Sequence, residues 1–444
     1  MRVGSATVDV TPDWSLPLAG FGARTLPSQG VSEPLHVRAA LIASIDEAGD
    51  ERRALIVSAD ILWWGPQQVP ALRSRLAGIA GVAEHAILFS ATHSHSGPQT
   101  SERAASGIGV LDPRFETLLA AQTEAAVRQA VSDLEPVTVI RHDGVHALGF
   151  NRRLAFDPDG PEDPALVVVA FVRPDGRPKT LLVHYTCHPV ITEEPLLSGE
   201  FPGVAMGCLG KDLGVDALFL QGCCGDINPI VHGRRQTERG DAADVERIGG
   251  ELASAVKALL GQPGRDLVPV PIAAVSEVVA LRFAAVPTVD DLHAKAGEAG
   301  VTGEWARALL AHPAWREPSI ALEVQRIDLA AGLSLLAMNG EIVVAYGLLV
   351  RALSNGDTLP VAYANGMTGY IPTERILAEG GYEAGDAGPW FLLPAPFATG
   401  IEDQLTTVLK RRSTPTPPCE RSGSGSPMPA GRSCPVVDIT EEDA

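Results

Sequence analysis

Short apolar segments that end in small or polar residues recur along the chain. Segments of this kind, rich in β-branched residues, are typical of strands, and they occupy residues 2–10, 36–45, 53–60, 85–92, 165–172, 179–186 and 217–222. Apolar residues at three- and four-residue spacing instead predict helices over 67–78, 114–134, 242–260 and 341–354. Two longer strand-like segments cover 270–283 and 322–340. Strands and helices interleave without strict alternation, so we expect an α/β fold with mixed sheets.

The composition changes abruptly near the end of the chain. From residue 413 onward Pro, Ser and Gly dominate, and the last residues are acidic. A segment of this kind buries too little apolar surface to offset the entropy lost on ordering. We therefore expect one main domain over residues 1–412 and a disordered tail over 413–444.

The net charge of the chain limits the kinds of partner that we expect it to bind. The 444 residues carry 35 Lys and Arg against 54 Asp and Glu, a net charge of −19, which argues against binding to nucleic acid or anionic lipid. No basic start precedes an apolar stretch, and no window reaches the roughly 20 apolar residues of a membrane span. We expect a cytoplasmic protein without a stable membrane anchor; its oligomeric state cannot be predicted.

The six cysteines do not predict a disulfide framework or a cysteine-based zinc site, because no CxxC pair is present. Four of them lie in apolar or motif segments and are expected to be reduced thiols, and the other two lie in the tail. In chain order they are Cys187, Cys208, Cys223, Cys224, Cys419 and Cys434.

Polar residues that could carry chemistry follow three of the predicted strands. His93 and His95 stand two positions apart, so an extended backbone would present both imidazoles to one site. His184 and His188 follow another strand, and one of them could complete a zinc site with His93. A third strand runs into the glycine-rich turn GCCGDINP, residues 222–229. The simpler alternatives are exposed loop histidines for the first cluster, a lone core histidine for the second and a tight structural turn for the third.

Together these segments resemble the catalytic N-terminal domain of the neutral/alkaline non-lysosomal ceramidase family. The similarity runs through VGSATVDVTP, AGFGAR, SATHSHSGP, FNRR, HYTCHPVI, SGEFPG, QGCCGDINP, NGEIVVAYG and the segment YANGMTGYIPTERILAEGGYEAG, in the family's order. The resemblance implies a neutral-ceramidase-like α/β domain that hydrolyses an amide bond by attack of zinc-bound water.

The resemblance also implies roles for individual residues. One Zn²⁺ per chain is expected on His93, His184, Glu341 and Tyr370. His95 matches the second histidine of the family motif and is expected to shuttle a proton, while Arg152 and Tyr382 match residues that line the substrate amide site. Two imidazoles, a carboxylate and a phenol oxygen form a donor set that suits zinc.

Two departures from the family affect the expected substrate. Asn228 stands where the family has a serine, and a carboxamide can hydrogen-bond to an oxyanion but cannot act as a nucleophile. We also expect the protein to lack the secretory signal and the C-terminal β-sandwich domain of the family. We therefore expect a small, soluble N-acyl amine as the substrate, although a link to lipid metabolism stays open. Condensation in a biosynthetic pathway, a non-catalytic metal- or ligand-binding homologue, and a cysteine nucleophile are the alternatives.

Overall fold

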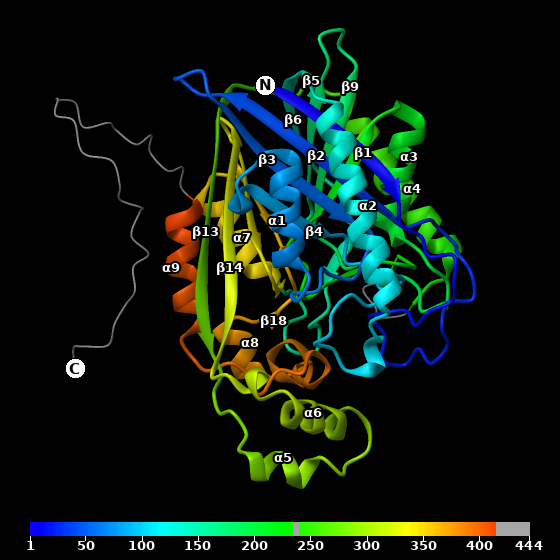
Figure 1. Ribbon diagram of the computed structural model, residues 1–444, viewed down its shortest axis with the longest axis vertical. Coiled ribbons are helices and arrows are strands. Elements are labelled where there is room, and N and C mark those ends of the chain that lie inside the picture. The colour runs from blue at the N-terminus through cyan, green and yellow to red at the C-terminus, as the bar shows by residue number, and fades with distance from the viewer. Residues whose placement is uncertain (234–238, 414–444) are drawn as a thin grey trace, which may run out of the picture. The chain divides into compact units, whose positions relative to one another are not determined.

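The computed structural model describes residues 1–233 and 239–413, and these belong to a single compact unit (Figure 1). Three larger sheets and two small ones are interleaved with helices, which confirms the predicted mixed α/β class. Apart from Ser413, which ends the last helix, the tail predicted over 413–444 lies outside the described residues. None of the described helices has the length and apolar character needed to cross a bilayer.

The first sheet has the order β4-β3-β2-β1-β5 and is antiparallel except for its β3–β4 pair. Its strands are β1 (Arg2–Asp9), β2 (His36–Ile45), β3 (Glu51–Ala59), β4 (Ile87–Ala91) and β5 (Glu135–Pro136). The second sheet has the order β10-β9-β8-β6-β12, and only β9 and β10 are parallel. Its strands are β6 (Thr138–Val145), β8 (Ala165–Val172), β9 (Pro178–Tyr185), β10 (Asp216–Gln221) and β12 (Arg265–Leu267).

The third sheet has the order β13-β14-β15-β17, with β15 and β17 parallel. Its strands are β13 (Pro269–Arg282), β14 (Ser319–Ala330), β15 (Leu333–Met338) and β17 (Thr358–Val361). Two small sheets pair β7 (Gly149–Asn151) with β11 (Ile227–Pro229), antiparallel, and β16 (Glu341–Ile342) with β18 (Tyr370–Ile371), parallel.

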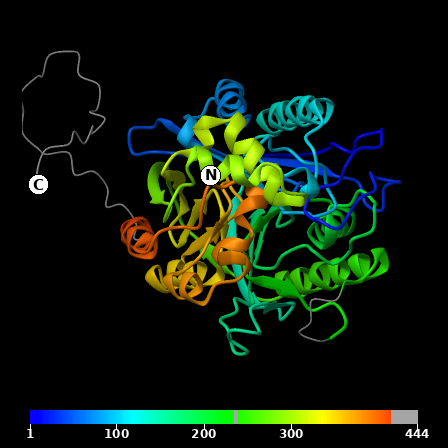
Figure 2. The same cartoon turned by 90° about the horizontal axis from the view of Figure 1, so that it is seen from below.

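Helices pack on the outer faces of the sheets (Figures 1 and 2). α1 (Val69–Ala80) and α2 (Pro113–Ser132) lie by the first sheet, and α3 (Glu200–Leu213) and α4 (Ala242–Leu260) by the second. α7 (Val344–Leu353) packs on β17, and α9 (Ile401–Ser413) packs on α7 and β13. Between β13 and β14 the chain leaves the sheet to form α5 (Val289–Lys295) and α6 (Gly300–Ala311), which lie in front in Figure 2. α8 (Glu374–Glu379) follows β18.

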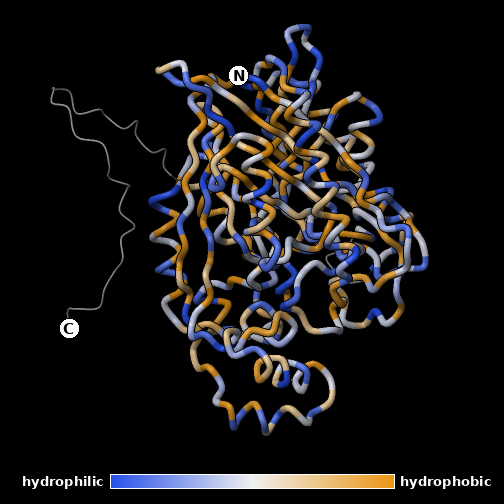
Figure 3. Tube along the Cα trace, in the orientation of Figure 1, coloured by the Kyte–Doolittle hydropathy of each residue, from blue (hydrophilic) through white to orange (hydrophobic). Residues whose placement is uncertain are grey.

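The strands are apolar on both faces because both faces are covered. In β2, Leu41 belongs to a core shared with α1 and α2, whereas Ile42 belongs to a core shared with the other two sheets. A third core lies between the second sheet and helices α3 and α4. Hydrophobic stretches of chain accordingly run through the sheets, and many of the hydrophilic stretches lie in outer loops (Figure 3).

Edge strands of the three larger sheets meet at their carboxyl ends. The backbone N–H of Ala362, after β17, donates to the carbonyl of Gln221 at the end of β10, and the N–H of Ala91 in β4 donates to the carbonyl of Tyr363. The loops that leave β4, β9, β10 and β17 therefore start from one small region.

Two predicted elements differ from the structure around this region. The helix expected over 341–354 begins only at Val344, because Glu341 and Ile342 form β16 beside Tyr370 and Ile371. The single segment expected over 322–340 is two antiparallel strands, β14 and β15, with Gly332 in the turn at φ 81°.

A buried ion pair anchors the segment that follows β3. Asp60 is fully buried, and its Oδ2 accepts from Arg38 Nη1 at 2.8 Å and from the backbone N–H of His36 at 3.0 Å. We predict that Asp60→Ala lowers the free energy of unfolding by about 3–5 kcal/mol, because it leaves the buried Arg38 unpaired. Arg52→Ala, which removes an exposed pair with Asp46, is the control and should cost less than about 1 kcal/mol. Equal losses in urea denaturation would contradict this account.

Candidate metal centre

Three imidazoles and one carboxylate converge beyond the carboxyl ends of β4 and β9. His93 and His95 follow β4, His188 follows β9, and Glu341 opens β16. Nitrogen atoms of the three histidines all lie within 4.8 Å of one another. Glu341 Oε2 lies 3.5 Å from His93 Nε2 and 3.3 Å from His188 Nε2, and His95 Nε2 lies 3.2 Å from His93 Nε2.

Backbone carbonyls fix the tautomers of two of these histidines. His93 Nδ1 lies 2.8 Å from the carbonyl oxygen of Leu62, and His188 Nδ1 lies 2.5 Å from that of Cys224. A carbonyl only accepts, so each Nδ1 carries the hydrogen, and in the neutral rings each Nε2 is left with a lone pair. Orientation of a metal-binding histidine by a hydrogen bond to its second nitrogen is the usual arrangement in metal sites.

The charges in this group suit a bound cation. Burial lowers the pKa of His188 to about 4. Burial alone would raise the pKa of Glu341, but His93 and His188 hold it well below its usual range, and the carboxylate is ionised. A buried carboxylate needs positive charge beside it, which either a proton on one of the imidazoles or a cation bound between these groups can supply. The donor set therefore fits a divalent metal such as zinc.

The structure does not bring His184, one of the four ligands expected from the family resemblance, into this group. His184 lies inside β9, and its Nε2 donates to the carbonyl of Pro360 at 2.7 Å while its Nδ1 accepts from Arg351 at 3.2 Å. Both of its ring nitrogens therefore have partners within the protein. His188, four residues later and beyond the strand end, lies in the group instead.

Tyr363, which the sequence analysis did not single out, packs against the centre. Its ring stacks on His93 with centroids 3.9 Å apart, and its hydroxyl donates to Glu341 Oε2 at 3.4 Å. Both His93 and Tyr363 have positive φ, 69° and 54°, a conformation that costs about 1–3 kcal/mol in a non-glycine residue. Such strain is often found at functional sites.

Tyr370 lies directly opposite Glu341 in the parallel β16–β18 pair, so both side chains project from the same face. Its phenol oxygen accepts from Arg152 Nη2 at 3.1 Å. Arg152 also donates to Glu383 Oε1 at 2.8 Å and to Asn228 Oδ1 at 3.3 Å. Arg152 therefore hydrogen-bonds to three other side chains of the protein, and it holds Tyr370 in place.

Asn228 and Tyr382 complete this side of the centre. Asn228 is buried, and because its oxygen accepts from Arg152, its amide nitrogen is left to donate. Tyr382 is 43% exposed, and its ring lies 5.4 Å from that of Tyr370. The structure thus gathers every predicted site residue except His184 around one point.

A buried glutamine connects the loops that carry the histidines. Gln221 Nε2 donates to the carbonyls of Thr92 at 3.0 Å and of Cys187 at 2.9 Å, and its Oε1 accepts from the Cys187 N–H. Thr92 precedes His93, and Cys187 precedes His188. One side chain at the end of β10 therefore fixes the spacing of both loops.

The buried cysteines do not support a thiolate nucleophile. Cys187, Cys208, Cys223 and Cys224 are all free thiols, as expected. Burial raises the pKa of Cys187, Cys223 and Cys224 above the usual range, so these thiols stay protonated at neutral pH. Cys419 and Cys434 lie outside the described residues.

The fold and the site together define an α/β protein with a buried histidine and carboxylate cluster of the kind that holds a divalent metal. Its fold is that of the neutral ceramidases. The neutral ceramidase from Pseudomonas aeruginosa superposes with a TM-score of 0.73 at 20% identity, over 93% of this chain and 74% of that one. A ceramidase complexed with C2 gives 0.75 at 19% identity, with the same coverage. No protein-family model and no curated protein sequence matches the chain.

Glu200, in the SGEFPG segment, is a buried carboxyl group whose titration should make the stability of the fold depend on pH. The residue is fully buried, its Oε1 accepts from the Thr192 N–H at 3.2 Å, and Oε2 has no partner among the described residues. Burial raises its pKa from 4.5 to about 7, so folding favours the protonated acid and wild-type stability falls as the pH rises through 7.

We predict that Glu200→Gln, which resembles the protonated acid, is more stable than wild type above pH 7 and that the difference disappears below about pH 4.5. The free energy of unfolding, measured by urea denaturation at several pH values, checks this prediction. A difference that is independent of pH would contradict the assignment of the titration to Glu200.

Proposed function

We propose that the chain is a metal-dependent hydrolase that cleaves the amide bond of N-acyl amines, with one zinc ion per chain. The observation that carries this proposal is the convergence of the Nε2 atoms of His93 and His188 on the Glu341 carboxylate. We assign His93, His188 and Glu341 as ligands, with Tyr370 beside them. The fold shared with ceramidases agrees with amide chemistry, and the substrate is proposed to be smaller and more soluble than ceramide.

The metal, when bound, would act as a Lewis acid and lower the pKa of water in the site. Glu341 and the two neutral imidazoles set the charge and geometry of the centre. His95 is placed to move a proton, because its Nε2 faces the centre and burial holds its pKa well below 6.5, which keeps the imidazole free to accept. Gly20 leaves room for this ring, since a Cβ there would lie 2.4 Å from His95 Nδ1.

The remaining site residues would bind and orient the amide. The Asn228 amide nitrogen can donate to the oxygen on which negative charge develops, and the exposed Tyr382 can contact the substrate at the mouth of the site. Arg152 acts through its neighbours, because it positions Tyr370 and Asn228. This assignment differs from the direct substrate contact expected from the family resemblance.

The paired variants His188→Ala and His184→Gln test the ligand set. We predict about one zinc per chain in wild type and in His184→Gln, and none in His188→Ala, after zinc loading and gel filtration. Hydrolysis of a panel of soluble N-acyl amines should fall by about 10³-fold or more in His188→Ala, because several kcal/mol of transition-state stabilisation are lost. Melting temperatures establish that both variants fold. Loss of zinc in His184→Gln with retention in His188→Ala would reverse the assignment.

His95→Ala separates a proton-shuttle role from a ligand role. We predict that the variant keeps its zinc and loses amide turnover by about 10²–10⁴-fold, the usual contribution of general acid–base catalysis. An unchanged rate would remove His95 from the mechanism. Loss of zinc would instead make His95 a ligand.

A further inference from the structure

A cavity of about 400 Å³ is lined by two aromatic residues that lie next to the candidate metal centre. Trp63 lies with its ring 6.2 Å from that of His93, and the ring of Phe391 lies 5.7 Å from that of Tyr370. The Trp63 and Phe391 rings are 5.5 Å apart, and both side chains line the cavity. The cavity and the site are therefore neighbours.

The wall of the cavity mixes apolar and polar side chains from distant parts of the chain. Val69 belongs to α1, Ile320 to β14, and Met367 to the loop before β18. Trp315 closes another side from the 3₁₀ turn Pro313–Arg316, which follows α6. Two carboxylates, Glu317 and Glu323, also line the wall. A volume of a few hundred Å³ in which aromatic residues stand beside polar groups is typical of small-molecule sites.

Arg103 is the cation of this wall that has no ion-pair partner among the described residues. Its Nη2 donates to the carbonyls of Trp315 at 3.3 Å and Leu392 at 3.2 Å, and its buried Nε has no partner there. The guanidinium carbon lies 5.7 Å from the centre of the Trp315 ring. Burial lowers the pKa of Arg103 to about 10, and no acidic neighbour opposes that effect.

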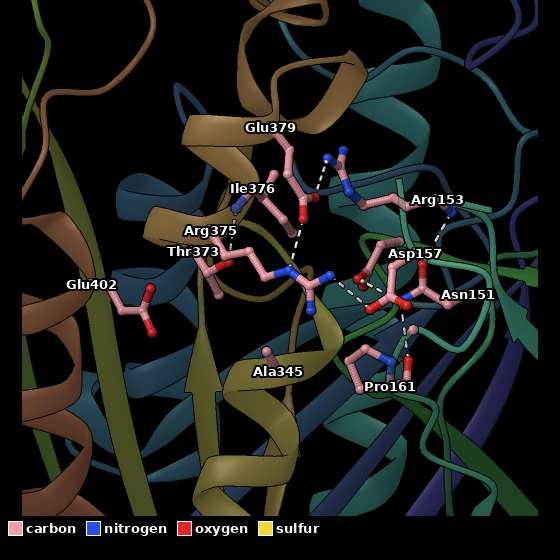
Figure 4. Close-up of a pocket in the computed structure, with 12 residues that line it drawn as sticks. Asn151, Arg153, Asp157, Pro161, Ala345, Thr373, Arg375, Ile376, Glu379 and Glu402 are labelled. Carbon is pink, nitrogen blue, oxygen red and sulfur yellow. Dashed lines mark hydrogen bonds and ion pairs between the residues drawn. The ribbon is translucent and has the colours of Figure 1, made fainter. Parts of the chain in front are cut away.

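Arg73, in the same wall, provides a contrast because it pairs with Glu323 at 3.2 Å. A second cavity, of about 230 Å³, provides another (Figure 4). There Arg375 pairs with Asp157 at 2.8 Å and with Glu379 at 2.7 Å, so its charge is already balanced within the protein. Among these cavity arginines, Arg103 is left with donors that a ligand could use.

An arginine without an ion-pair partner beside aromatic side chains favours an anion, since the planar guanidinium binds a carboxylate through charge-assisted hydrogen bonds. We propose that the aromatic and aliphatic side chains of the cavity bind the apolar part of a carboxylate-bearing ligand, with Arg103 receiving the carboxylate. Its position next to the candidate metal centre, at Trp63 and Phe391, makes the preferred substrate an N-acyl amine whose apolar substituent ends in a carboxylate. This last step rests on the function proposed above, whereas binding in the cavity does not.

Calorimetric titration of the full chain with octanoate, octan-1-ol and octylamine tests whether the cavity prefers a carboxylate. The His188→Ala variant is titrated beside wild type, so that binding of octanoate to a metal ion is excluded. We expect octanoate to bind about tenfold more tightly than octanol in both proteins, and octylamine to bind most weakly. Arg103→Gln should abolish the preference for octanoate, and the matched control Arg73→Gln should keep it, with all variants shown to fold by their melting temperatures. Equal binding of octanoate and octanol, or a preference that survives in Arg103→Gln, would overturn the proposal.

Hydrolysis of a matched pair of N-acyl amines, one ending in a carboxylate and the other in its methyl ester, tests the substrate step. We expect kcat/KM to be about tenfold higher for the acid in wild type and equal for both in Arg103→Gln. If octanoate binding depends on Arg103 but the acid is not preferred, the substrate assignment is overturned and the cavity is a site for free carboxylic acids. If no amide is hydrolysed while that binding persists, the proposed function fails and the cavity proposal stands.

Discussion

The structure depends on the buried carboxylate at its centre, where Glu341 lies 3.5 and 3.3 Å from the Nε2 atoms of His93 and His188. Backbone carbonyls hold the two rings by their Nδ1 atoms, so each Nε2 stays turned toward the carboxylate. Positive charge is needed among these groups, and a bound cation would supply it. Much of the surrounding fold, including three sheets that meet at their edges, serves to bring these groups together.

Local sequence patterns were sufficient to predict the mixed fold, the strands leading into His93 and His188, and helices such as that over 242–260. These elements depend on apolar periodicity, which can be read within a short window. His93 and His95 were singled out by a motif that follows a strand, and the family resemblance pointed to Glu341, Tyr370, Arg152, Asn228 and Tyr382. These residues lie around one point, so the strand-end motif and the resemblance together were informative about where the site lies.

The rest depended on contacts between distant segments. His184 and His188 both follow apolar residues, and the choice between them rests on Pro360 and Arg351, which lie more than 160 residues away and occupy both nitrogens of His184. Likewise, Glu341 begins an apolar helical pattern but lies in β16, because pairing with Tyr370 overrides local propensity. Tyr363 and Gln221 act through tertiary contacts for which a single sequence offers no periodic signal.

The most direct test of the central claim is a crystal structure of the zinc-soaked protein with anomalous data collected at the zinc edge. The account predicts one strong peak about 2.0–2.2 Å from the Nε2 atoms of His93 and His188 and from a carboxylate oxygen of Glu341. A peak beside His184, or no peak at the centre in crystals soaked at saturating zinc, would contradict it.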